Sequence, residues 1–170
     1  MTRIRIEEVP SFYQTYVRHV IHTDMHDALV TSGKAMDQLV SDISPEKENF
    51  AYAPGKWTVK EVLCHIADAE RIFVYRALAF SRNDKNNLPG FDENAYVPES
   101  DASRRTVQAI RQELINLRAS TIDFFNSCSE EMLSRKGIAN NTEISVRALG
   151  YVVSGHAMHH LQILKQRYLG

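Results

Sequence analysis

The sequence is poor in residues that interrupt helices, with only seven glycines and five prolines among 170 residues. These residues cluster between long segments in which apolar side chains recur every three or four positions. No stretch shows the sustained alternation of apolar and polar side chains that is typical of strands. The sequence therefore predicts an all-α fold.

Other absences narrow the class of protein. The two cysteines, Cys64 and Cys128, lie far apart within helical patterns, so we expect reduced, buried thiols and no disulfide framework. The net charge is −1 and the basic residues are scattered, which leaves no electrostatic footprint for nucleic acid. No apolar run approaches the roughly 18 residues of a membrane span, and the N-terminus lacks the apolar core of a signal peptide. We expect a cytoplasmic protein without nucleic-acid or membrane partners.

The periodic segments predict four long amphipathic helices, and four such helices indicate a four-helix bundle. The length of the chain fits a single domain, 1–170. Two shorter helical segments, 10–21 and 129–133, accompany them. The expected ranges of the long helices are 24–43, 58–80, from 100–103 to 128, and 145–168.

Two of these helices have clear start signals. Thr58 and Glu61 match a capping box, and Trp57 and Val62 occupy the positions of a hydrophobic staple. Ser145 is expected to cap the last helix. These signals fix the beginning of the second and fourth long helices.

The connection at 82–100 is unusually long. Loops of this length are usually functional or disordered, and Phe91, Tyr96 and Val97 argue against disorder. Two interpretations stay open: the connection walls a pocket, or it is a structural crossover between parallel helices.

Three of the seven histidines fall within five residues of the last helix. His156 and His160 are four residues apart and share one helix face, among apolar side chains where an unpartnered imidazole is unfavourable. A hydrogen-bonded core pair and a metal site both satisfy this pattern. His65, on the second long helix, is either a lone core histidine or a third ligand. Together the three would leave coordination positions open, as catalytic sites do.

Two other histidine patterns have a bearing on metal binding. His19, His22 and His26 have a spacing that could form a rival metal site, but they straddle the predicted break between two helices. The residue after His156 is Ala157, so the general base of the HExxH metalloprotease pattern is absent. Peptide hydrolysis of that type is excluded.

Three segments carry a family resemblance that spans nearly the whole chain, from about 12 to 169. GKWTVKEVLCHIADAER (55–71), LPGFDENAY (88–96) and EISVRALG (143–150), the last followed by 155–168, resemble the sequence blocks of the DinB-like (YfiT-like) superfamily of damage-inducible metal-dependent enzymes. This family is distinct from the translesion polymerase that shares its name.

The resemblance implies a four-helix bundle with a long crossover connection, a divalent metal and a homodimer. It places the metal ligands on His65, His156 and His160, whereas His159 matches no ligand position. Imidazole suits zinc, nickel, iron or copper, and we expect nickel or zinc. Related members include thiol S-transferases that use bacillithiol or mycothiol and a mycothiol-dependent isomerase.

The expected function is transfer of a low-molecular-weight thiol to an electrophile, with the metal holding the thiol as thiolate. Metal-dependent hydrolysis of a small molecule is the alternative, as is a non-enzymatic metal-binding stress or sensor module. Asp68 or Glu70 could orient an imidazole or act as a base, although interhelix ion pairs are the more common role of such residues. Arg147 could meet an anionic cofactor or serve a surface role, and Trp57 is expected to act as the staple.

Overall fold

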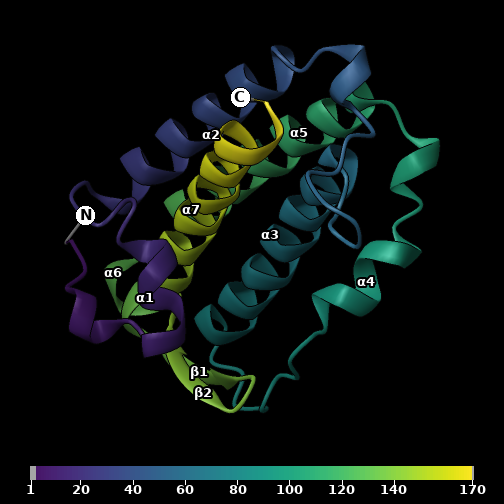
Figure 1. Cartoon of the computed structure of the whole chain (residues 1–170). Coiled ribbons are helices and arrows are strands. Elements are labelled where there is room, and N and C mark those ends of the chain that lie inside the picture. Colours follow the sequence, from purple (N-terminus) through teal and green to yellow (C-terminus); the bar gives the residue numbers. More distant parts are fainter. Residues whose placement is uncertain (1–2, 170) are drawn as a thin grey trace.

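The predicted four-helix bundle is present in the computed structural model, which describes residues 3–169 (Figure 1). Helices α2 and α3 each pack against both α5 and α7. None of the described helices is long and apolar enough to cross a membrane. The four bundle helices are α2 (Met25–Ser41), α3 (Val59–Ser81), α5 (Val107–Asn126) and α7 (Val146–Ile163).

Shorter elements decorate the bundle. Helix α1 (Ser11–Val17) packs on α7, and α6 (Glu130–Ser134) lies beside α3 and α7. The expectation that the first segment continues to residue 21 was wrong, because the chain leaves α1 through turns such as Val20 N–H to Val17 O. The other short helical elements are 3₁₀ helices at Ile6–Glu8, Pro45–Lys47 and Ala102–Arg104. Helix α7 ends in a π-helical segment at Leu164–Tyr168.

The long connection after α3 is the crossover. In Figure 1 it rises along the outside of the bundle from the lower end of α3 to the upper end of α5, so these two helices run parallel. It is not structureless, because it contains helix α4 (Glu93–Glu99), which packs against α3. Helix α5 begins at Val107, later than the predicted start, because Thr106 rather than an earlier serine caps it.

A β-hairpin stands where the sequence indicated only a break before the last helix. Strands β1 (Lys136–Ala139) and β2 (Thr142–Ser145) pair antiparallel. Asn140 and Asn141 form the turn with φ angles of 51° and 58°, the conformation that two-residue hairpins require and that asparagine tolerates. Strands of four residues are too short for the alternation of side chains to be recognised in the sequence.

The predicted helix caps are present. The Thr58 side chain accepts a hydrogen bond from the Glu61 N–H, and the Thr58 N–H donates to Glu61 Oε2 at 2.7 Å. Ser145 accepts from the N–H of Ala148 at the start of α7. Both cysteines are buried free thiols, as expected.

The core consists of two apolar clusters separated by a layer that contains polar side chains. On α7 the change from one cluster to the other falls between Val153 and Ala157, where His156 lies. On the remaining bundle helices the change coincides with buried polar residues, namely Ser32 on α2, Glu70 on α3, and Arg118 and Thr121 on α5. This layer crosses the middle of the bundle and includes the candidate site.

Candidate metal centre

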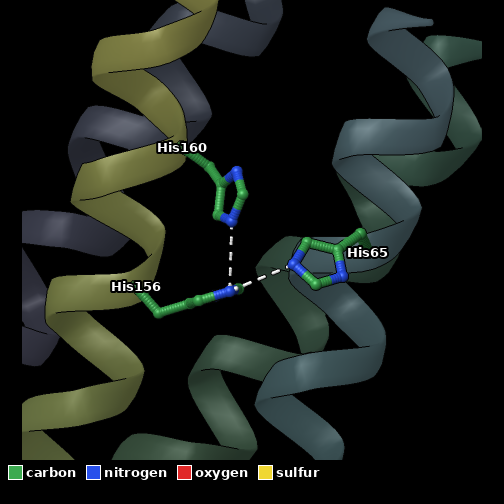
Figure 2. A group of neighbouring side chains, drawn as sticks. All are labelled: His65, His156 and His160. Atoms are coloured by element: carbon green, nitrogen blue, oxygen red, sulfur yellow. Dashed lines mark hydrogen bonds between the residues drawn. The ribbon is translucent and has the colours of Figure 1, made fainter. Parts of the chain in front are cut away.

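Two neighbouring helices place three histidines around one point. Figure 2 shows His65 on α3 facing His156 and His160, which lie one turn apart on α7. The Nε2 atom of His156 is 3.1 Å from Nε2 of His65 and 3.2 Å from Nε2 of His160. Among the described residues, this is the one group of His, Cys, Asp and Glu side chains whose ligand atoms could share an ion, and these atoms all lie within 4.8 Å of one another.

The helix starts and one glycine explain this placement. The capping box fixes where α3 begins, and His65 follows in its second turn. On the other side, Gly155 lets α1 approach α7, because a Cβ there would lie 2.3 Å from the Tyr16 carbonyl oxygen. The Tyr16 ring consequently packs edge-on against His156, with centroids 5.3 Å apart. The α7 histidines are thus held between α1 and α3.

Burial keeps these imidazoles neutral. Desolvation lowers the pKa of His65 to about 4, although the Glu93 carboxylate acts in the opposite direction. Desolvation, together with His65 and His159, lowers the pKa of His160 to about 3, and burial holds the pKa of His156 well below 6.5. A neutral imidazole offers the lone pair that a metal requires.

The donor set fits a divalent ion better than it fits a purely hydrogen-bonded group. A ring nitrogen has one in-plane bonding direction, so His156 Nε2 cannot make well-aligned hydrogen bonds to both of its neighbours. Nitrogens bound about 2.0–2.1 Å from a tetrahedral zinc ion lie about 3.3 Å apart. The separations of His156 from His65 and from His160 are close to that value, and all three ligand atoms lie within 4.8 Å of one another.

A cavity of about 180 Å³ opens onto the three histidines. Aromatic side chains from α1, α3 and the loops form much of its wall, and Glu93, Arg76 and Asn140 supply the polar part. The aromatic members are Phe12, Tyr13, Tyr16, Trp57, Phe73 and Phe91.

Several candidates from the sequence lie outside the centre. Glu70 forms a buried ion pair with Arg118, its Oε2 lying 2.8 Å from Nη2, and Asp68 pairs with Arg71 at 3.5 Å. Neither carboxylate hydrogen-bonds to the three imidazoles, so neither orients them. Arg147 forms an ion pair with Glu130 and does not line the cavity.

The other histidines do not form a second centre in the described chain. His26 Nδ1 lies 2.9 Å from Asn126 Oδ1, and His26 is not part of the cavity lining. His19 and His159 contact each other, with ring centroids 5.9 Å apart, and His159 also packs on Tyr16. The rival site proposed for His19, His22 and His26 is therefore not assembled.

Sequence reasoning missed most of the cavity wall, and four of its residues bear on the chemistry. Trp57 was assigned only to the helix start, yet its ring lies 4.9 Å from that of His65. Tyr16, Arg76 and Glu93 carry no motif. Tyr16 reaches the cavity through the packing of α1 and Glu93 through the crossover, whereas Arg76 lies on α3, about three turns after His65. One signal existed for Glu93, since the crossover was expected to wall a pocket if it was functional.

The comparisons with known proteins assign the chain to a family. The model of the DinB superfamily matches residues 28–164. The chain belongs to the DinB superfamily. This DinB chain is also 26% identical over 148 residues to the protein of Oceanobacillus iheyensis named "Putative metal-dependent hydrolase OB0413", and the match covers 84% of each.

Solved structures share the fold of this DinB chain. YfiT from Bacillus subtilis, described as a probable metal-dependent hydrolase with an unusual four-helix bundle topology, matches with a TM-score of 0.72 and 16% identity over 97% of this chain and 90% of YfiT. A mycothiol-dependent maleylpyruvate isomerase matches with a TM-score of 0.69 and 12% identity, over 95% of this chain and 62% of the isomerase. At these identities the two matches establish the fold alone.

Proposed function

We propose that this DinB chain is a metal-dependent enzyme in which His65, His156 and His160 hold a divalent ion at the base of the cavity. The observation that carries the proposal is the convergence of three neutral imidazoles on one side of an accessible cavity. Three protein ligands with an open remaining side are typical of catalytic sites, whereas structural sites are closed by a fourth ligand. The expected ion is nickel or zinc, because imidazole suits both.

Hydrolysis of a small molecule is the reaction that we place first. When bound, the ion supplies Lewis-acid chemistry: it lowers the pKa of a water ligand to about 7 or keeps a thiol ligand deprotonated. The aromatic wall excludes bulk water and holds the apolar part of the substrate. Glu93, the carboxylate of the cavity lining, is placed to accept a proton there. The names given to the relatives from O. iheyensis and B. subtilis support this choice.

Transfer of a low-molecular-weight thiol is the second candidate. Six aromatic side chains line the cavity, and a thiolate attacks electrophiles most readily where water is excluded. The likeness to a mycothiol-dependent enzyme supports this candidate. The sequence also leaves open a non-enzymatic metal-binding module. Such a module would not need an open cavity.

Metal analysis of the purified protein tests the ligands. We expect about one divalent ion per chain in the wild type and loss of roughly tenfold or more in affinity in His160→Ala, because a ligand is removed. His159→Ala is the matched control: it removes the adjacent imidazole, which lies outside the cluster, and should retain the ion. Full metal retention by His160→Ala would refute the three-histidine centre.

A substrate screen of the metal-loaded protein tests the chemistry. Turnover of an ester or amide without any thiol supports hydrolysis, whereas conjugation of monochlorobimane with a small thiol supports transfer. If the metal-loaded protein turned over neither class while binding its ion tightly, the enzymatic proposal would be rejected in favour of a metal-binding module.

A further inference from the structure

Arg76 is a buried cation without an anionic partner. Its side chain, on α3, is 3% exposed and lines the cavity. Its Nη2 donates to the Pro89 carbonyl oxygen at 2.9 Å, and its Nη1 lies 3.5 Å from the Tyr13 hydroxyl. No described carboxylate lies within ion-pair distance of it, and the Glu93 of the cavity wall is exposed.

This arrangement is unusual for arginine. Arginine is almost never fully buried without a counter-charge, because desolvating a guanidinium is unfavourable unless an anion and good hydrogen bonds compensate for it. Arg118, equally buried in the same bundle, has that compensation in a two-point ion pair with Glu70. The guanidinium of Arg76 lacks it.

One hydrogen-bond donor of Arg76 has no partner in the described protein. A guanidinium carries five N–H donors, and the Nε of Arg76 makes no hydrogen bond among the described residues. Among the described residues, every fully buried side-chain nitrogen or oxygen has a hydrogen-bond partner. The Nε is therefore not sealed in protein, and Arg76 is one of the residues that line the cavity.

We propose that Arg76 binds the carboxylate of an organic anion whose other end reacts at the histidine centre. The inference rests on the proposed function and specifies its substrate class. One guanidinium matches one carboxylate through two parallel hydrogen bonds, and the acidic Glu93 in the same wall disfavours a doubly charged phosphate. The neighbouring rings of Tyr13, Phe73 and Phe91 accommodate an apolar body between the two ends.

Binding to the metal-free protein tests the assignment without using activity. The full chain is stripped of metal with a chelator and titrated calorimetrically with phenylacetate and 3-phenylpropanoate, each beside its uncharged amide. Without an ion, a preference for the acid over its amide must come from the protein's own cations and hydrogen-bond donors. We expect at least one carboxylate to bind about tenfold or more tightly than its amide, which corresponds to about 1.4 kcal/mol.

Two variants locate the effect. Arg76→Gln keeps an N–H donor for the Pro89 carbonyl but removes the charge, so it should lose the preference for the carboxylate. Arg82→Gln removes an exposed arginine near the end of the same helix and should retain the preference. Circular dichroism and thermal unfolding check that both variants fold.

The outcomes separate this proposal from the metal function. If neither carboxylate binds, if each amide binds equally well, or if a folded Arg76→Gln keeps the preference, Arg76 is a structural residue and the proposal is overturned. If Arg76→Gln does not fold, the wild-type comparison of acid and amide decides the matter. Retention of metal by the wild type is measured separately, so failure here leaves the histidine centre intact.

Discussion

Two polar clusters lie in the middle of the bundle, and they are satisfied in different ways. Between α2, α3 and α5, Arg118 contacts both oxygens of Glu70 at 2.9 and 2.8 Å and also donates to Ser32 Oγ, while Thr121 donates to Glu70. Between α1, α3 and α7, three imidazoles face one another and Arg76 faces a cavity. The first cluster is closed by the protein itself. The second has donors and lone pairs that the protein does not use.

The two clusters differ in whether the protein itself satisfies their buried polar groups. A buried network whose members satisfy one another fixes helix register and has nothing left for a ligand. Neutral imidazoles and an uncompensated guanidinium are tolerated in a folded chain when a bound ion or substrate completes them. Both clusters belong to the layer that separates the two apolar clusters. One side of this layer is a closed structural network, and the other side holds the proposed metal centre.

The largest expected effect comes from breaking the closed cluster. In Arg118→Ala the Glu70 carboxylate stays buried without its counter-charge, and such single removals lower the free energy of unfolding by about 3–5 kcal/mol. Urea denaturation measures this loss. The double variant Glu70→Leu/Arg118→Leu leaves no unpaired charge and should be less destabilised than Arg118→Ala. A loss below about 1 kcal/mol in the single variant would show that the network is not structural.

Acidification probes the open cluster and has an intermediate effect. The folded pKa values of His65 and His160 are about 4 and about 3, below the value of about 6.5 expected for the unfolded chain. Between these values the unfolded chain binds more protons, so stability is retained above pH 6.5 and falls as the pH drops towards 4. The fall is up to about 1.4 kcal/mol per pH unit for each histidine.

Urea denaturation of the chelator-treated protein at pH 7, 6 and 5 measures this dependence. The variant His22→Gln, which changes a histidine outside the cluster, should keep it, whereas His65→Gln should weaken it. A metal-free protein that is equally stable at pH 7 and pH 5 would contradict the assignment of neutral, buried imidazoles.

The smallest effect is expected at Asp68, the carboxylate one turn after His65. Its pKa is raised by burial, while Arg71 acts in the opposite direction, and their partly exposed ion pair contributes at most about 1 kcal/mol. Asp68→Asn should therefore retain the metal content of the wild type, with His65→Gln as the variant that loses it. Metal loss in Asp68→Asn would mean that this carboxylate supports the centre after all.

The α7 part of the candidate site could be foreseen because its signal is local: spacing puts His156 and His160 on one helix face. His65 joined them only through the resemblance to the family's sequence blocks, because its local pattern fits a lone core histidine as well. The crossover was foreseen as a long connection, but its helix α4 and the Asn140–Asn141 hairpin were not, because their short segments carry little periodic signal. Homodimerisation stays a prediction from the family resemblance.

By itself the sequence determined the bundle, its four helices and the shared face of His156 and His160, because helix periodicity, capping and i,i+4 spacing act over a few residues. The third candidate ligand, His65, came from the family resemblance. Only the tertiary structure decided which polar groups meet. It joined Glu70 to Arg118 across 48 residues, removing a candidate from the site, and it brought α1 against Gly155 and the crossover beside Arg76. Whether a buried charge has a partner depends on packing between helices distant in sequence, and no local pattern encodes that.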